Sequence, residues 1–318
     1  MTYVLLIVGF ALLIKGADYF VEGSSNIAAL LKIPSLLVGL TIVAFGTSSP
    51  EATVSIIAAL EGNSEVSLGN VIGSNIFNIT LVVGITAMIN PLQVERDTIR
   101  KEIPFTLLAS VALWVMISDI ALQGLSANQI TRNEGIILLL FFAIFLYYIF
   151  ELARNSRDND EVKSVDTTGI TWGKNIIFTL AGLAAIIFGG DMVVDNATTI
   201  ALSIGMSETL VGLTIVAIGT SLPELITSIT AAIKKESEIA LGNIVGSNIF
   251  NILFVLGASA SIAPLAVNNK IFFDLIFMII FTVVLMIFSR SKFKISKREG
   301  AILAAIYVGY LIYIIIRN

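Results

Sequence analysis

Two long blocks of this sequence occur twice, 173 residues apart, and this duplication constrains the fold more than any other feature. Residues Val38–Glu51 (VGLTIVAFGTSSPE) match Val211–Glu224 (VGLTIVAIGTSLPE), and Leu68–Ile79 (LGNVIGSNIFNI) match Leu241–Ile252 (LGNIVGSNIFNI). Because both pairs share one offset, the chain is an internal duplication. Each copy places a carboxylate, a proline and several small oxygen-bearing side chains within apolar sequence, which points to ions crossing a membrane.

Composition places the chain in a bilayer. Its mean hydropathy is +0.94 and only 13% of its 318 residues are charged, whereas soluble domains have about 25%. The net charge of −4 offers no basic surface for nucleic acid. Cysteine and histidine are both absent from the sequence, so any bound metal must be held by oxygen.

Apolar stretches of about 17 to 25 residues can cross a hydrocarbon core as helices, and the sequence predicts ten of them. Each half holds five, and an odd number makes the second repeat enter the membrane from the opposite face. The predicted fold class is therefore an all-α polytopic membrane protein with ten transmembrane helices in two inverted-topology five-helix repeats. The predicted spans are 3–22, 36–60, 66–89, 104–121, 134–152, 175–194, 209–233, 239–263, 272–289 and 299–316.

The distribution of basic residues predicts the orientation. Fifteen of the nineteen Lys and Arg residues lie on the side that holds the loops after the odd-numbered spans, and cytoplasmic loops carry such an excess. Both termini are therefore predicted to be extracellular, with a first repeat at 1–153, a cytoplasmic linker at 154–174 and a second repeat at 175–318. The charged runs Glu95–Glu102 and Arg290–Arg298 are predicted to be solvated loops.

The repeated blocks break the helices that carry them. Pro50 has no N–H and kinks its helix, so backbone carbonyls just before it become available. In lipid an unpaired carbonyl costs several kcal/mol, so such a break is tolerated only where it lines a cavity or binds something. Around the break, four residues share roughly one helical face, and two more share a face on the next span. They are Ala44, Thr47, Ser48, Glu51, Ser74 and Asn78, with the copies Ala217, Thr220, Ser221, Glu224, Ser247 and Asn251.

Together the two copies offer carboxylates, amides, hydroxyls and carbonyls, which form a hard, all-oxygen ligand set. Calcium takes about six to eight such oxygens with flexible geometry, whereas magnesium demands a tight octahedron. Calcium therefore fits better, with sodium as its competitor of similar size. An ionised side chain at the bilayer centre costs on the order of 3 kcal/mol, so Glu51 and Glu224 should need a bound cation, and ion release should await ion replacement.

Each candidate also has a structural interpretation. The glutamates are either ligands or buried groups satisfied by nearby hydroxyls or a lysine, and the ligand role is favoured because intramembrane acids are usually functional. Asn78 and Asn251 either contact the ion or hydrogen-bond between helices. The serines either bind the ion or cap freed backbone groups.

Two further patterns predict structure rather than function. The pairs Gly69/Gly73 and Gly242/Gly246 have the small-xxx-small spacing of closely packed helices. Lys15 is predicted to neutralise Asp18, which lies three residues further along the same helix.

The pattern GTSxPE followed by GNxxGSNxFN, present twice in inverted halves, resembles the alpha-repeats of the cation/calcium exchanger superfamily, specifically the sodium/calcium exchangers. The resemblance covers all ten predicted spans, with alpha-repeats at 38–79 and 211–252. It implies that Glu51 and Glu224 coordinate Ca²⁺ centrally, aided by the carbonyls of Thr47 and Thr220. It also implies flanking Na⁺ sites that involve Ala44, Ser48 and Ser74 on one side and Ala217, Ser221 and Ser247 on the other.

The resemblance implies a secondary antiporter of the cell membrane, not an enzyme, that expels Ca²⁺ against Na⁺ by alternating access. Its first and sixth helices would slide against the other eight. The ions are its substrates, the lipid bilayer is its surroundings, and no cofactor, nucleic acid or protein partner is required. Asn251 stands where potassium-dependent relatives carry Asp, which favours potassium independence and leaves two central carboxylates.

Two other functions remain open from the residues alone. A Ca²⁺/H⁺ antiporter of the same fold would use carboxylate protonation instead of Na⁺. A passive cation channel would use the two glutamates as a selectivity ring, although broken helices in inverted repeats argue against it. An intramembrane hydrolase is set aside because no nucleophile and base are paired in the sequence.

Overall fold

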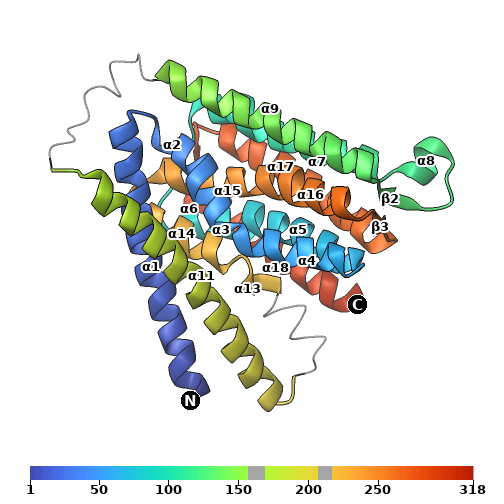
Figure 1. Ribbon diagram of the computed structural model, residues 1–318, viewed down its shortest axis with the longest axis horizontal. Coiled ribbons are helices and arrows are strands. Elements are labelled where there is room, and N and C mark those ends of the chain that lie inside the picture. Colours follow the sequence, from blue (N-terminus) through green and yellow to red (C-terminus); the bar gives the residue numbers. More distant parts are fainter. Residues whose placement is uncertain (157–168, 207–216, 318) are drawn as a thin grey trace.

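The computed structural model describes residues 1–156, 169–206 and 217–317, and these are mostly helical (Figure 1). The helices of the first half are α1 (Thr2–Leu31), α2 (Ser35–Val38), α3 (Ala44–Thr47), α4 (Ser49–Leu60), α5 (Ser64–Phe77), α6 (Val83–Ile89), α7 (Ile103–Met116), α8 (Asp119–Gln123) and α9 (Arg132–Ser156). Those of the second half are α11 (Trp172–Ser203), α13 (Ala217–Gly219), α14 (Leu222–Ile233), α15 (Ser237–Ile249), α16 (Leu256–Ile262), α17 (Asn269–Arg290) and α18 (Lys297–Arg317).

Wide π-helical turns interrupt several of these helices. Gly39–Val43 joins α2 to α3, Asn78–Val82 joins α5 to α6, Thr98–Glu102 precedes α7 and Phe250–Val255 joins α15 to α16. Such turns are rare and are frequently found at functional sites. Two of them contain Asn78 and its copy Asn251, so the same local distortion appears in both halves.

Seven of the described helices are long and apolar enough to cross a membrane, and the bent pair Ser35–Thr47 and Ser49–Leu60 makes eight if it counts as one span. The protein is thus a helical multi-pass membrane protein, as predicted. These seven or eight spans in the described residues are fewer than the ten predicted. The predicted span 104–121 corresponds to the shorter helix α7, and positions 209–216 of another span lie outside the described residues, as do positions 157–168 of the linker.

The predicted helix break at Pro50 is confirmed. The helical segments on either side of Ser48 meet at 49°, and Pro50 lies in the first turn of α4, where its missing N–H leaves no hydrogen bond unmade. The second half repeats the arrangement, since Pro223 lies in the first turn of α14 just after Ser221. Both breaks therefore start a new helix immediately before a glutamate.

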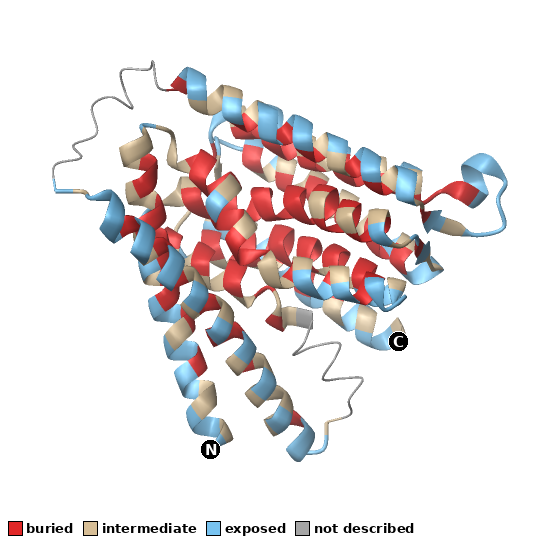
Figure 2. Ribbon diagram, viewed as in Figure 1, coloured by how far each residue is buried: buried red, intermediate tan, exposed pale blue. Residues whose placement is uncertain are grey.

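Helix α15 lies at the centre of the bundle (Figure 2). In the span Ser237–Ile262, 94% of the most apolar window is buried, against 22% for α9 at the periphery. Close packing is possible because a side-chain carbon at Gly242 would lie only 2.6 Å from the Leu36 carbonyl oxygen. The predicted packing is thereby confirmed for α15, whereas Gly69 and Gly73 meet no such close neighbour among the described residues.

Helices α1 and α11 form a separate pair that crosses the bundle at a steep angle (Figure 1). A side-chain carbon at Gly16 would lie 2.8 Å from the Gly182 carbonyl oxygen, and one at Gly182 would lie 2.7 Å from that of Gly16. Only glycine permits this approach of the two backbones. The two helices therefore pack backbone against backbone at these glycines.

Two short antiparallel ribbons join loops from opposite halves of the chain. Strand β1 (Leu92–Gln93) pairs with β4 (Lys294–Ile295), and β2 (Asn128–Ile130) pairs with β3 (Leu265–Val267). The expectation of an all-α protein misses these ribbons, because strands of two or three residues carry no periodic pattern.

The charged run Glu95–Glu102 is not wholly solvated, so that prediction is wrong at its end. Glu102 is fully buried and accepts a hydrogen bond from the hydroxyl of Tyr148 on α9. The π-helical turn before α7 directs this carboxylate inward, and a buried hydroxyl partner offsets part of its desolvation.

Candidate functional site

Two glutamates lie buried in the middle of the molecule. Glu51 lies in the first turn of α4 and Glu224 in the first turn of α14, and both side chains are fully buried. The first turn of a helix has unpaired N–H groups and the positive end of the helix dipole, which favour a negative charge. The two carboxylates are close enough for their charges to interact, as the duplication predicts.

Each carboxylate is held by a serine of the other half. Ser48 donates a hydrogen bond to Glu224 Oε1 at 2.7 Å, and Ser221 donates to Glu51 Oε1 at 3.0 Å. Ser74 also donates to Glu51 Oε1 at 3.3 Å. The structure therefore brings these five predicted residues into one cluster, and the cluster is built across the boundary between the halves.

Several buried polar atoms of the predicted ligands have no hydrogen-bond partner among the described residues. The second carboxylate oxygens of Glu51 and Glu224, both polar atoms of the Asn78 side chain and the Oδ1 atom of Asn251 form no hydrogen bond with the described residues, although all are buried. The Nδ2 group of Asn251 donates to Ser74 Oγ at 3.4 Å. An unpaired buried polar group costs about 1–3 kcal/mol, and more if it is charged. This set of oxygens has the composition that a hard cation such as Ca²⁺ or Na⁺ prefers.

The backbone before the first break also faces the cluster. Thr47 is fully buried at the end of α3. The hydroxyl of Ser247 donates a long hydrogen bond, 3.5 Å, to the carbonyl oxygen of Ala44. In the second half, Thr220 is partly buried beyond α13. Ala217 begins α13, but its side chain lies outside the described part of the chain.

Sequence reasoning missed an asparagine that braces each break. Asn70 donates to the Glu51 carbonyl oxygen at 3.2 Å and to Ser55 Oγ at 2.9 Å. Its own Oδ1 atom accepts from the Thr220 hydroxyl of the other half at 3.3 Å. The side chain thus ties the helix that carries Glu51 to the broken span that carries Glu224.

Asn243 repeats these bonds with the halves exchanged. It donates to the Glu224 carbonyl oxygen at 3.4 Å and to Ser228 Oγ at 3.0 Å, and it accepts from Thr47 at 3.0 Å. The signal was available, because this asparagine is the second residue of the GN pair in both repeated blocks.

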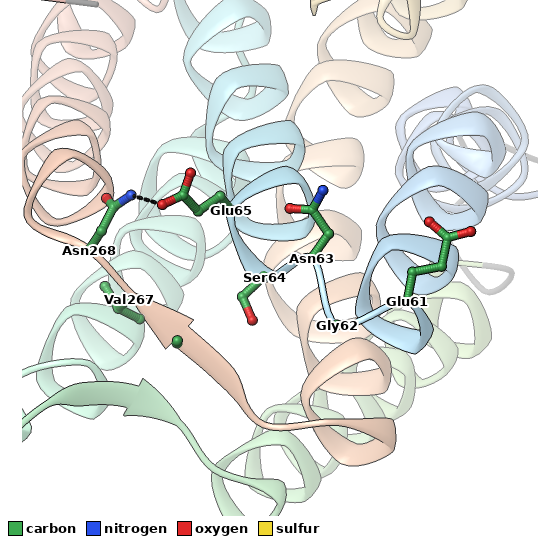
Figure 3. A pocket seen from close by; sticks show the side chains of 8 residues that line it. Glu61, Gly62, Asn63, Ser64, Glu65, Val267 and Asn268 are labelled. Carbon is green, nitrogen blue, oxygen red and sulfur yellow. Dashed lines mark hydrogen bonds between the residues drawn. The ribbon is translucent and has the colours of Figure 1, made fainter.

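A cavity of about 660 Å³ lies beside the cluster and includes Ser74 and Thr220 in its lining. A smaller pocket of about 430 Å³ lies further out, where the turn between α4 and α5 meets β3 (Figure 3). Its lining includes Glu61 and Glu65, and Asn268 donates to Glu65 at 2.8 Å. None of the predicted ligands lines this outer pocket, so it is separate from the cluster.

The described residues include no group of three or more acidic, cysteine or histidine side chains that could hold a metal. The cluster instead combines two carboxylates with amides and hydroxyls.

Fold and site together define a multi-pass membrane protein with two carboxylates buried between the halves of a duplicated chain. The protein belongs to the sodium/calcium exchanger protein family, whose pattern matches residues 1–151 and 174–316. This family consists of ion transporters that move Na⁺ and Ca²⁺, and it is not a family of enzymes.

Two curated relatives and one solved structure illustrate the similarity. The chain is 32% identical to Sodium/calcium exchanger MaX1 of Methanosarcina acetivorans, covering 98% of this chain and 97% of the relative. It is 40% identical to Inner membrane protein YrbG of Escherichia coli, covering 82% of this chain and 79% of the relative. The solved structure of the sodium-calcium exchanger NCX_Mj soaked with 2.5 mM Na⁺ and 10 mM Sr²⁺ matches with a TM-score of 0.83 at 30% identity. The match covers 97% of this chain and 98% of that chain.

Proposed function

We propose that the protein is a secondary antiporter that exchanges Na⁺ for Ca²⁺ by alternating access and normally extrudes Ca²⁺. One observation carries this proposal: two fully buried carboxylates each keep an oxygen that has no partner among the residues that the structure describes. Two uncompensated charges in a membrane interior are costly, and a divalent cation between them relieves both desolvation and repulsion.

The proposed Ca²⁺ site is formed by Glu51 and Glu224 with the carbonyls of Thr47 and Thr220. The asparagines near the carboxylates, Asn78 and Asn251, contribute oxygens directly or through water. Proposed Na⁺ sites flank the centre, and their ligands are Ala44, Ser48 and Ser74 on one side and Ala217, Ser221 and Ser247 on the other. The reciprocal bonds from Ser48 and Ser221 support this assignment, because each serine already lies against the carboxylate of the opposite half.

The proposed topology has ten spans in two inverted five-helix repeats, 1–153 and 175–318, joined by a cytoplasmic linker at 154–174, with both termini extracellular. The reciprocal bonds of Asn70 and Asn243 support the repeat relation, since each bond in one half has a counterpart in the other. Alternating access would move the pair α1 and α11 against the rest of the bundle.

Transport into proteoliposomes tests this function. An outward Na⁺ gradient should drive ⁴⁵Ca²⁺ uptake, whereas a proton gradient of the same size should not. Glu51→Gln and Glu224→Gln should each abolish uptake, because the remaining carboxylate cannot neutralise a divalent ion. Glu61→Gln serves as the matched control, since Glu61 is exposed at the end of α4, and it should transport normally.

Other outcomes would select the rival functions. Uptake that follows only the proton gradient would identify a Ca²⁺/H⁺ antiporter. Downhill Ca²⁺ flux without any counter-ion, at a rate near that of a single channel, would identify a passive pore. Full activity of either buried glutamine variant would contradict the central site itself.

A further inference from the structure

The far end of α14 is tied to the middle of α1 by charged and polar contacts. The ammonium group of Lys234 lies 2.7 Å from Asp18 Oδ1, donates to the Asp18 backbone oxygen at 2.8 Å and lies 3.7 Å from Glu22 Oε2. Two residues further along, Glu236 Oε1 accepts a hydrogen bond from Ser25 at 2.8 Å. These contacts join the α1/α11 pair to the broken helix that carries a central carboxylate.

This connection differs from the one between α1 and α11. At Gly16 and Gly182 the backbones of α1 and α11 pack directly against each other, whereas the Lys234 and Asp18 side chains that join α14 to α1 are 26% and 39% exposed. An ion pair with access to water forms and breaks readily. The sequence-based pairing of Asp18 with Lys15 is therefore wrong, because a lysine from the other half of the chain takes that place.

The described residues of the second half show no corresponding clamp. The copies of the two acidic residues of α1 are Asp191 and Asp195 on α11. Neither has an ion pair within the described part of the chain, and both line a cavity of about 500 Å³ beside Pro50 and Pro223. The acids that lie against a lysine in one half thus line a cavity in the other.

Charge explains this difference. The residue that corresponds to Lys234 in the first half is Glu61, 173 positions earlier. Glu61 is exposed at the end of α4 (Figure 3), and a carboxylate would repel the acids of α11 rather than bind them. The two halves carry the same predicted ion-site residues but differ in this contact.

We propose that Lys234 is a gating residue whose ion pair with Asp18 holds α1 against α14 and closes the route from the ion cluster to the face that carries Lys234. This inference rests on the proposed alternating-access function, in which that face is cytoplasmic. Opening the route must break the pair. Because the other half has no equivalent clamp, the pair favours the state in which the opposite side is accessible.

The neighbourhood of Thr227 supports this reading. Thr227 lies one turn beyond Glu224 in the direction of Lys234, and it is fully buried. Its hydroxyl has no hydrogen-bond partner among the described residues. Its copy in the first half, Val54, is 38% exposed and lines the cavity beside Asp191. Thr227 is therefore the position that should gain access to water when the clamped side opens.

A single-cysteine reporter tests the proposal, because the chain contains no cysteine of its own. Thr227→Cys is labelled with a charged, membrane-impermeant thiol reagent applied in turn to each face of the full-length protein in proteoliposomes. Labelling from the Lys234 face should be slow. Adding Lys234→Gln should speed it by about two- to fivefold, the range allowed by loss of one partly exposed ion pair.

Matched variants isolate the ion pair. Lys235→Gln makes the same change of charge at an exposed neighbour without an ion pair in the described structure, and it should leave the rate unchanged. Lys234→Arg should also leave it unchanged. Asp18→Asn should speed labelling as much as Lys234→Gln, and combining the two should add nothing further.

The outcomes separate the gate from the transport function. Equal labelling of the reporter with and without Lys234→Gln, in protein that still exchanges Na⁺ for Ca²⁺, would overturn the gate alone. Loss of exchange in every variant, the reporter included, would refute the proposed function, while a labelling difference would still reveal the clamp. If Lys234→Gln does not fold, Asp18→Asn carries the same comparison.

Discussion

Replacing Glu51 by glutamine should stabilise the protein without Ca²⁺ and remove most of the stabilisation that Ca²⁺ provides. Glutamine keeps the shape of the side chain and an oxygen that can accept the bonds from Ser74 and Ser221. It removes one of two buried, interacting charges. Two unit charges a few ångströms apart repel by roughly 3–4 kcal/mol at an effective dielectric constant of about 20. The free energy of unfolding without Ca²⁺ should therefore rise by up to this amount.

The effect of Ca²⁺ follows from mass action. A ligand at about 100 times its dissociation constant stabilises the folded state by about 2.7 kcal/mol. If losing one of the two carboxylates weakens binding about 100-fold, the same Ca²⁺ concentration stabilises the variant by only about 0.4 kcal/mol. Calcium should thus raise the melting temperature of the unsubstituted protein clearly and that of the variant hardly at all.

Thermal unfolding in detergent measures both effects. The fluorescence of Trp114 and Trp172 reports unfolding, first with a chelator and then across a Ca²⁺ titration. Glu61→Gln is the matched control and should change neither the melting temperature in chelator nor the Ca²⁺-dependent rise. A Glu51→Gln variant that melts below the unsubstituted protein in chelator, yet keeps the full rise with Ca²⁺, would refute the reasoning.

Four further predictions concern the scaffold and the ion preference. Gly242→Ala should destabilise the protein by about 1–3 kcal/mol, because its new carbon would collide with a backbone oxygen of α2, whereas Gly309→Ala, at a site with open space, should not lower the melting temperature. Asn243→Leu should cost about 1–3 kcal/mol in unfolding free energy, since it leaves buried hydrogen-bonding groups unpaired, and exchange rates should fall with it. Partial burial and the neighbouring charge of a carboxylate on α15 raise the pKa of Glu95 to about 7. The stability that its protonated form gives is present at low pH and lost as the pH rises through about 7, so Glu95→Gln should raise the melting temperature near pH 9 more than near pH 5. Asn251→Asp should make Ca²⁺ uptake depend on K⁺, which assays with and without K⁺ will reveal.

The central cluster could be predicted because its parts are local and repeated. Pro50 breaks its helix through its own covalent structure, and the position of Glu51 one residue later follows from the sequence. The constant offset between the copies then identified Glu224 as its counterpart. Spacing also predicted that residues such as Ser48 share a face with the glutamate of the same helix.

Partners from the other half could not be predicted in this way. Helical spacing shows which residues share a face, but it does not show which helix covers that face. Ser48 therefore bonds to Glu224 rather than to the glutamate beside it, and Asp18 pairs with Lys234 rather than with its neighbour on α1. Glu102 likewise turned out buried because α9, far along the chain, supplies Tyr148. In each case tertiary packing decided between options that the local sequence left equal.

The exchanged serine bonds suggest why an exchanger of this construction should resist moving empty. Each carboxylate takes one bond from the opposite half, so the cluster is complete only while the breaks before α4 and α14 lie together. Any rearrangement that opens one side must disturb bonds that belong to both halves. If the proposed central site is filled, the charges of Glu51 and Glu224 attract a common cation, which would keep the halves together during the change. Without a cation, the two carboxylates repel each other in a medium of low dielectric constant. The empty protein would therefore begin the movement without the ion that both halves bind.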